Sequence, residues 1–185
     1  MKDYGHPLPH LPQGDLWVFG YGSLMWRPGF AHLEALPARL MGYHRALCVW
    51  SWHHRGSPQC PGLVFGLDRG GSCRGRALRV AAAERKQVAE YLYERELVTP
   101  VYVPRLLPVR LAQGTVTALT FTIDRRHPQY AGRLDPAVAA AVVSASHGHS
   151  GPNREYLLNT LAHLQDLGID DPKLAQVARL VKVSP

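Results

Sequence analysis

The sequence predicts an α+β fold in which a small mixed, barrel-like sheet is flanked by helices. Four short apolar segments in the first half are separated by Pro-Gly, Gly-Gly and Ser-Pro pairs, which is typical of strands joined by turns. One helical segment follows, then two further extended segments, and the last third of the chain is helical. Because so many short strands lie close together in the sequence, we expect a strongly curved sheet or a small barrel.

The predicted strands are apolar segments bounded by turn residues. The last of them is rich in Thr, which favours extended backbone. A helix at 82–97 separates the first four strands from the last two. The six predicted strands span residues 16–21, 38–52, 62–68, 76–80, 101–111 and 115–123.

The C-terminal helices have recognisable ends. An Asp-Pro pair supplies an N-capping carboxylate and a proline at the first helical position, and a glycine accepts the left-handed conformation that often closes a helix. The pairs are Asp135-Pro136 and Asp171-Pro172, the glycines are Gly148 and Gly168, and the helices they bound are predicted at 137–147, at 152–167 and after Asp171.

Length and composition favour a single folded domain. The chain has 185 residues, of which 46% are hydrophobic and 19% charged, enough to bury a full core. We expect residues 1–15 to form a tail and residues 16–185 one domain. No apolar run approaches the roughly 20 residues of a membrane helix, so a cytoplasmic protein without a membrane partner is the expectation.

The charge and the cysteines exclude several kinds of site. The formal charge of +7 comes from scattered basic residues, so nucleic-acid binding is only a third possibility. The three cysteines form no Cys-x-x-Cys pair, which argues against a disulfide framework and a zinc ribbon. Four histidines could be assembled into a metal site, but their spacing is not that of a helix-borne pair, and we expect surface residues. These are His53, His54, His147 and His149.

Glu96 is a carboxylate on an apolar face of the predicted helix 82–97. It shares that face with Val88 and Leu92 by helical spacing. Burial there would raise its pKa toward neutrality, where a carboxyl group can accept and donate protons. The alternative is a structural ion pair with Arg95 or another arginine near the helix end.

The segment "VFGYGSLMWRPGF" at 18–30 joins a strand to a Gly-Tyr-Gly-Ser turn. It resembles the signature of the gamma-glutamylcyclotransferase superfamily, and in particular of its ChaC branch, which acts on glutathione. Further matches follow in the order of that branch, from the first motif to the end of the chain. They are "HHRG" at 53–56, "PG" at 61–62, "EYLYERE" at 90–96, "PQYAG" at 128–132 and "GHSGPNREYL" at 148–157.

The resemblance implies a gamma-glutamylcyclotransferase-like fold and an enzyme that cleaves a gamma-glutamyl amide without water. In that reaction the substrate's own α-amine attacks the γ-carbonyl, giving 5-oxoproline and, from glutathione, cysteinylglycine. The family's catalytic glutamate matches Glu96, which would serve as general acid and base. The resemblance implies no metal and no cofactor, and glutathione as the small-molecule partner. The oligomeric state stays open, with a monomer as the default.

The resemblance also implies the residues that bind substrate. A glycine turn can bring backbone amides close to a carboxylate or a developing oxyanion. The alternative for Asn153 is a helix cap and for Tyr156 a core tyrosine. Arg55, like His54, is either a polar group of the pocket or a loop residue that makes turn contacts. The implied binding residues are Tyr21, Gly22, Ser23 and Leu24 in the turn, with Arg55, Tyr102, Asn153 and Tyr156.

Two positions depart from the pattern of the branch. Leu63 follows Pro61-Gly62 where an arginine is usual, and residues 97–100 replace a glycine-rich link to Tyr102. Both concern the choice of substrate more than the type of reaction. Cyclotransfer on another gamma-glutamyl amine or amino acid therefore stays open, as does a non-enzymatic regulator of cation transport.

Overall fold

The computed structural model describes residues 4–183, and the chain divides into two compact units. The first unit contains residues 1–45 and 67–127, and the second contains residues 46–66 and 128–185. Two long strands, β2 (Glu34–Ser51) and β3 (Gly62–Val80), contribute residues to both units.

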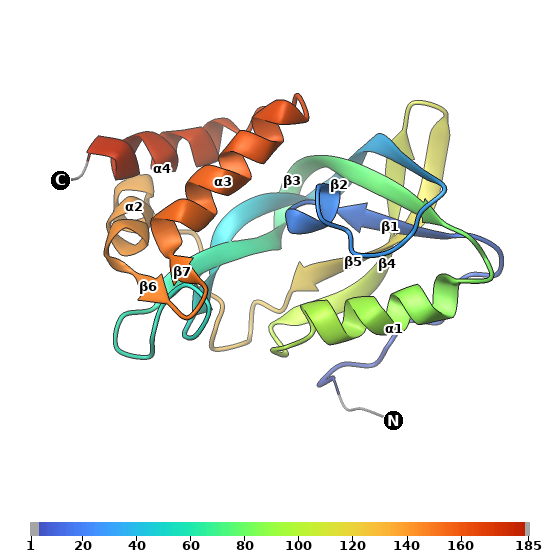
Figure 1. The fold of residues 1–185 in the computed structure, drawn as a ribbon, viewed down its shortest axis with the longest axis horizontal. Coiled ribbons are helices and arrows are strands. Elements are labelled where there is room, and N and C mark those ends of the chain that lie inside the picture. The colour runs from blue at the N-terminus through green and yellow to red at the C-terminus, as the bar shows by residue number, and fades with distance from the viewer. Residues whose placement is uncertain (1–3, 184–185) are drawn as a thin grey trace. The chain divides into compact units, whose positions relative to one another are not determined.

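A closed barrel of five strands forms the first unit (Figure 1). The strand order is β1-β3-β2-β4-β5, where β1 is Leu16–Gly20, β4 is Tyr102–Leu111 and β5 is Gly114–Ile123. Two parallel pairings close it, since Trp17 lies opposite Ala118 and Leu67 lies opposite Thr122. The other pairs with a determined register are antiparallel, so the predicted mixed, barrel-like sheet is confirmed.

Helix α1 (Arg85–Glu96) packs its apolar face against the barrel. Val88 and Leu92 are buried in one cluster with strand residues such as Leu119, which stabilises a helix too short to persist alone. The opposite face is solvent-exposed, as its charged residues at every fourth position predict. These exposed residues are Lys86, Glu90 and Glu94.

A short 3-10 turn, η1 (Ser23–Met25), follows β1 directly. Leu24 of this turn belongs to the same buried cluster as Val88 and Leu92. Residues 4–15 form no helix or strand, but three of their apolar side chains, Tyr4, Leu8 and Leu11, pack against that cluster. The division into a tail and one domain stays a prediction.

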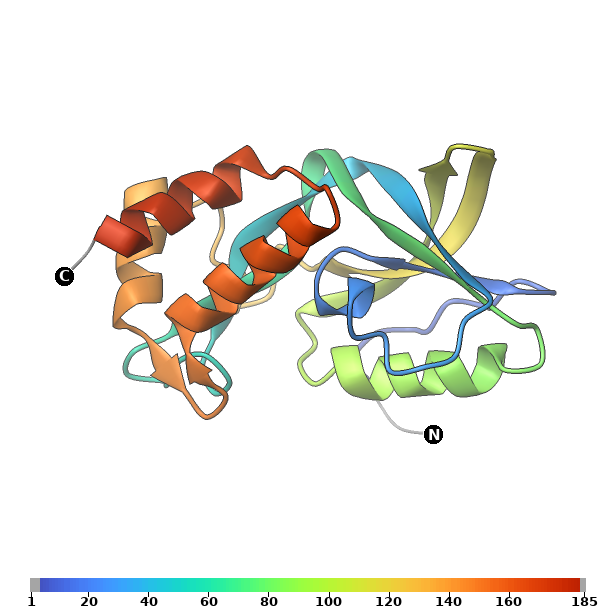
Figure 2. The same ribbon diagram turned by 45° about the horizontal axis from the view of Figure 1, so that its top comes forward.

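The second unit contains the C-terminal helices (Figure 2). These are α2 (Pro136–Ala145), α3 (Asn153–Asp166) and α4 (Pro172–Val183), with the two-residue strands β6 (His147–Gly148) and β7 (Gly151–Pro152) between the first two. Asp135 caps α2 by accepting from the Ala137 amide at 2.8 Å, Asp171 accepts from the Leu174 amide at 3.1 Å, and Gly168 has φ +65° after α3. The predicted caps at these three positions are confirmed.

Two predicted boundaries are wrong. Residues 62–68 and 76–80 belong to one strand, because Gly70 and Gly71 take positive φ angles of 101° and 68° and let β3 continue through the bend. Gly148 does not end α2, which stops at Ala145. A Cβ on Gly148 would stand 2.5 Å from the His53 carbonyl oxygen, so this glycine permits a close approach of two backbone segments.

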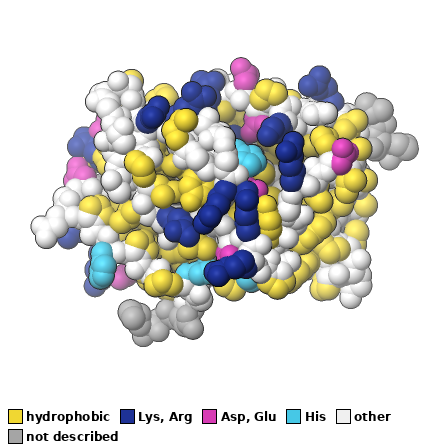
Figure 3. Space-filling model, turned by 180° about the vertical axis from the view of Figure 1, so that it is seen from behind, with side chains coloured by type: hydrophobic (Ala, Val, Ile, Leu, Met, Phe, Trp, Pro, Cys, Tyr) yellow, Lys and Arg dark blue, Asp and Glu magenta, His cyan; other side chains and the backbone are white. Residues whose placement is uncertain are grey.

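Basic side chains stand among apolar and neutral ones on the face seen in Figure 3. No helix within residues 4–183 has the length and apolar character needed to cross a membrane.

Candidate functional site

The turn after β1 keeps one side open. The Met25 amide donates to the Gly22 carbonyl at 2.9 Å, and the Arg27 amide donates to the Ser23 carbonyl at 2.7 Å. A Cβ built on Gly22 meets no heavy atom within 4 Å. The amides of Ser23 and Leu24 are the first two of the turn, where helical groups lack an internal acceptor. The turn can therefore present backbone donors to a ligand.

A buried arginine supports the other side of this turn. Arg45 is 7% exposed, and its Nε donates to the Tyr21 carbonyl at 2.5 Å while Nη2 donates to the Arg74 carbonyl at 2.8 Å. The carbonyl of Tyr21 thus points to the protein interior. Tyr21 itself is buried, whereas Ser23 is exposed.

Glu96 ends α1 with a side chain that is 22% exposed. Burial raises the pKa of its carboxyl group above the ordinary value, and the charge and hydrogen bond of Arg95 oppose this rise. Arg95 Nε lies 3.1 Å from Glu96 Oε1. The sequence left open whether Glu96 is a proton carrier with a raised pKa or one member of an ion pair. In the structure both features occur together, since Glu96 is paired with Arg95 and the pKa of its carboxyl group is raised.

Arg95 also contacts the turn. Its Nη2 donates to the Ser23 hydroxyl at 3.0 Å, and its Nη1 donates to the carbonyls of Arg27 and Pro28 at 2.8 and 2.9 Å and to the Tyr91 hydroxyl at 3.0 Å. Sequence reasoning saw Arg95 only as a partner for Glu96. Nothing in helical spacing indicates contacts with residues about 70 positions earlier in the chain.

Tyr102 begins β4 and is partly buried against the cluster that contains Leu24 and Leu92. The first unit thus brings together several predicted site residues around the end of α1. They are Leu24 and Tyr102, which share the cluster, and Ser23 and Glu96, which share Arg95.

In the second unit, Asn153 is fully buried at the start of α3. Its Oδ1 accepts from the Leu63 amide at 2.7 Å, and its Nδ2 donates to the Leu63 carbonyl at 2.8 Å. Leu63 is itself fully buried, which suits an apolar side chain at this departure from the motif. Asn153 therefore connects α3 to β3, and its role toward a substrate stays a prediction.

Tyr156 and Arg55 lie together in the same unit. The Tyr156 hydroxyl accepts from the Phe65 amide at 3.1 Å, and the Arg55 guanidinium carbon lies 5.3 Å from the centre of the Tyr156 ring, a distance at which the cation is attracted to the aromatic face. Arg55 Nη1 also donates to the Ser150 carbonyl at 2.6 Å. Both residues hold loop and helix together, and their part in binding stays a prediction.

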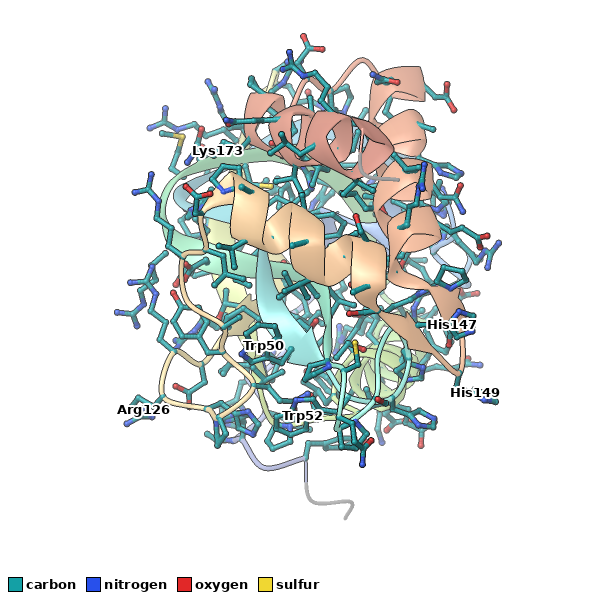
Figure 4. The ribbon with its side chains drawn as sticks, turned by 90° about the vertical axis from the view of Figure 1, so that its left-hand side faces the viewer. Trp50, Trp52, Arg126, His147, His149 and Lys173 are labelled. Carbon is teal, nitrogen blue, oxygen red and sulfur yellow. The ribbon has the colours of Figure 1, made fainter. Side chains whose placement is uncertain are left out.

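Four histidines of this unit, His53, His54, His147 and His149, lie in or beside the β6–β7 hairpin, where Figure 4 shows His147 and His149. The rings of His53 and His149 are stacked with centres 5.3 Å apart, and His54 Nδ1 lies 3.1 Å from the Ser150 hydroxyl. Burial lowers the pKa of His54, and the neighbouring His53, His149 and Arg55 lower it further. In the part of the chain that the structure describes, no three His, Cys, Asp or Glu side chains are arranged to hold a metal ion.

Trp50 and Trp52 follow each other closely at the end of β2 and lie near one another in Figure 4. Trp50 is partly buried, whereas Trp52 is 42% exposed.

Of the two units, the first holds the groups that are suited to catalysis. A half-buried carboxyl group with a raised pKa can take a proton from an amine and return it to a leaving group. Backbone amides at an open turn can stabilise a developing negative charge. Both groups are tied to Arg95, so the arrangement suits proton transfer coupled to attack at a carbonyl.

Comparison with known proteins agrees with this reading. A family model described as ChaC-like protein matches residues 16–184. The chain is 36% identical over 171 residues to the glutathione-specific gamma-glutamylcyclotransferase of Escherichia coli, covering 92% of this chain and 74% of that protein. It is 32% identical to the human glutathione-specific gamma-glutamylcyclotransferase 1, covering 95% of this chain and 84% of that one.

A solved structure shares the fold. The yeast gamma-glutamylcyclotransferase specific to glutathione superposes with a TM-score of 0.81, at 22% identity, and the match covers 92% of this chain and 96% of the yeast chain. The predicted fold class is therefore confirmed.

Proposed function

Because the chain belongs to the ChaC-like family, we propose that it is a glutathione-specific gamma-glutamylcyclotransferase. The single observation that carries the proposal is the half-buried Glu96 carboxyl group, connected through Arg95 to the open turn at Ser23. The reaction converts glutathione into 5-oxoproline and cysteinylglycine.

Glu96 acts as the proton carrier. The α-amine of glutathione is an ammonium group at neutral pH and attacks only after it loses a proton. Glu96 accepts that proton, and the amine then forms its bond to the γ-carbon. Glu96 donates the proton to the departing nitrogen of cysteinylglycine as the amide bond breaks. The raised pKa of the carboxyl group suits this double role, since a catalytic group works best when its pKa lies near the operating pH.

The turn at residues 21–24 holds the gamma-glutamyl group. Ring closure requires the amine and the carbonyl carbon to stand roughly 3 to 3.5 Å apart, and holding a flexible arm in that geometry supplies a large part of the rate. The open space at Gly22 allows the substrate to approach the amides of Ser23 and Leu24. Those amides are placed to bind a carboxylate or the oxyanion of the tetrahedral intermediate.

Four further predicted residues complete the proposed set. Tyr102 borders the buried cluster of the first unit, and a partly buried tyrosine can add one polar contact to an apolar wall. Arg55, Asn153 and Tyr156 belong to the second unit. Their existing hydrogen bonds support a role in shaping loops, and we propose them as substrate residues on the strength of the motif alone.

We further propose that the protein works as a cytoplasmic monomer. Glutathione as substrate favours the cytoplasm, and three free cysteines, two of them buried, are compatible with a reducing compartment. Light scattering on the purified protein tests the monomer, and a stable dimer would refute it.

Product analysis tests the proposed function. The purified protein is incubated with reduced glutathione, oxidised glutathione, gamma-glutamyl amino acids and gamma-glutamyl amines, and 5-oxoproline is measured together with the released amine. We expect reduced glutathione to be converted most efficiently. Preference for another compound would contradict the specificity, and binding of glutathione without 5-oxoproline would point to a non-enzymatic protein.

A further inference from the structure

Arg95 makes contacts with three separate parts of the first unit. It contacts the Glu96 carboxylate and the Tyr91 hydroxyl on its own helix, α1. It also contacts the Ser23 hydroxyl of η1 and two backbone carbonyls of the segment after η1. Its side chain is only 22% exposed. A planar guanidinium with five N–H donors can serve several acceptors at fixed angles, which a lysine ammonium cannot do from the same position.

We propose that Arg95 is a positioning residue, whose guanidinium fixes the Ser23–Met25 turn against the end of α1 and thereby sets the separation of the turn from the Glu96 carboxylate. This inference rests on the proposed function, in which the turn holds the substrate and Glu96 transfers the proton. Arg95 is not assigned a contact with the substrate.

The contacts of Arg95 are divided between holding the turn and orienting the carboxylate. Three bonds, to Ser23 Oγ and to the carbonyls of Arg27 and Pro28, span the turn from its first residue to the two residues beyond its C-cap, at 2.8 to 3.0 Å. A further contact, from Nε to Glu96 Oε1 at 3.1 Å, helps to orient the carboxylate. A displacement of about 1 Å between such groups costs on the order of 100-fold in rate.

The charge of Arg95 has a second effect, on the Glu96 carboxyl group. Burial raises its pKa, and Arg95 lowers it by charge and by hydrogen bonding. The groups that η1 and the following residues present to the guanidinium are a hydroxyl and two carbonyls, which are uncharged. Among the described residues, Tyr91 of α1 contacts Arg95, Tyr93 of α1 belongs to the buried cluster beside them, and Tyr4 and Tyr102 pack against that cluster.

Two substitutions separate the two effects. Arg95→Met removes both the charge and the fork, whereas Arg95→Lys keeps a positive charge but cannot span the same acceptors. Arg85→Gln is the matched control, because Arg85 lies on the same helix and donates to a distant carbonyl, that of Gly14, at 3.3 Å. Thermal unfolding of every variant shows how much of it is folded at the assay temperature.

Three measurements are made on the full chain. They are kcat and KM for 5-oxoproline release from glutathione between pH 4 and 9, titration of the Glu96 carboxyl carbon by NMR with Glu96→Gln to assign its signal, and amide hydrogen exchange at Met25 and Arg27.

We expect Arg95→Met to lower kcat/KM about 100-fold, to raise the pKa of the Glu96 carboxyl and to speed exchange at both amides. Arg95→Lys should leave the pKa of the Glu96 carboxyl near the wild-type value. It should still lower kcat about as much as Arg95→Met does, and the amides of Met25 and Arg27 should exchange faster than in the wild type. Arg85→Gln should match the wild type in all three measurements.

Two outcomes would overturn the inference. One is an Arg95→Lys variant with the kcat and the amide exchange rates of the wild type. The other is a loss of kcat in both Arg95 variants that is no larger than their unfolded fraction explains. If the wild-type protein releases no 5-oxoproline, the proposed function fails by itself. The NMR titration and the exchange rates then still decide whether Arg95 couples the turn to Glu96, since neither needs turnover.

Discussion

Arg95 and Glu96 are neighbours on the last turn of α1 and form an ion pair, with Nε 3.1 Å from Oε1 and both side chains 22% exposed. Burial raises the pKa of the carboxyl group more than the arginine lowers it. A carboxylate in this setting is less stable than one in water, which a structural ion pair alone would not require. The pair therefore fits a group that must change its protonation state.

The raised pKa predicts how the activity depends on pH. As a base, Glu96 must be ionised in the free enzyme, so kcat/KM should fall as the pH drops through the pKa of this carboxyl group. Because burial raises that pKa, the midpoint of the fall should lie above the ordinary value of 4.5. Initial rates at substrate concentrations well below KM give the midpoint, and a midpoint at or below 4.5 would contradict the assignment.

The same shift predicts an effect on stability. Below the pKa of the unfolded chain the group is protonated in both states and contributes nothing. As the pH rises through the higher pKa of the folded state, the folded protein increasingly bears the unfavourable ionised form. We expect Glu96→Gln to raise the melting temperature at pH 8 relative to the wild type, with a smaller difference at pH 4. A difference in melting temperature that is larger at pH 4 than at pH 8 would contradict this prediction.

Asn153 predicts a loss of stability in the second unit. Its side chain satisfies both backbone groups of the buried Leu63, and each buried group left without a partner costs about 1–3 kcal/mol. Asn153→Ala should therefore lower the free energy of unfolding by several times the effect of Asn159→Ala, an exposed residue on the same helix. Urea unfolding measures both, and equal values would contradict this role for Asn153.

Gly20 at the end of β1 and Gly22 in the turn should respond differently to alanine. A Cβ on Gly20 would stand 3.1 Å from Leu24 Cβ, whereas a Cβ on Gly22 meets nothing within 4 Å. Gly20→Ala should therefore lower the melting temperature. Gly22→Ala should lower it less, yet raise KM, because the new methyl group enters the space proposed for the substrate. An unchanged KM in a folded Gly22→Ala variant would contradict the proposal that the substrate binds on that side of the turn.

Local sequence patterns predicted the features that depend on neighbouring residues. The spacing of Val88, Leu92 and Glu96 placed the carboxylate on the buried side of α1, and the Asp-Pro pairs located the starts of α2 and α4. Each of these features is set by helical geometry or by capping within one turn.

Features that depend on distant residues could not be predicted in this way. Arg95 reaches Ser23 across 72 positions, and Asn153 reaches Leu63 across 90. Gly148 reads as a helix end, although its lack of a side chain serves the close approach of the His53 carbonyl. Tertiary contacts decide these positions, and no periodicity in the chain records them.

The most direct test of the account compares 5-oxoproline release from glutathione by the wild type, by Glu96→Gln and by Glu90→Gln at neutral pH. Glu90 lies on the same helix and is exposed, so its substitution should leave the rate unchanged. Loss of a general acid or base typically lowers the rate about 100- to 10,000-fold. We expect Glu96→Gln to remain folded and to lower kcat at least about 100-fold. A folded Glu96→Gln protein that retains wild-type turnover would contradict the central claim.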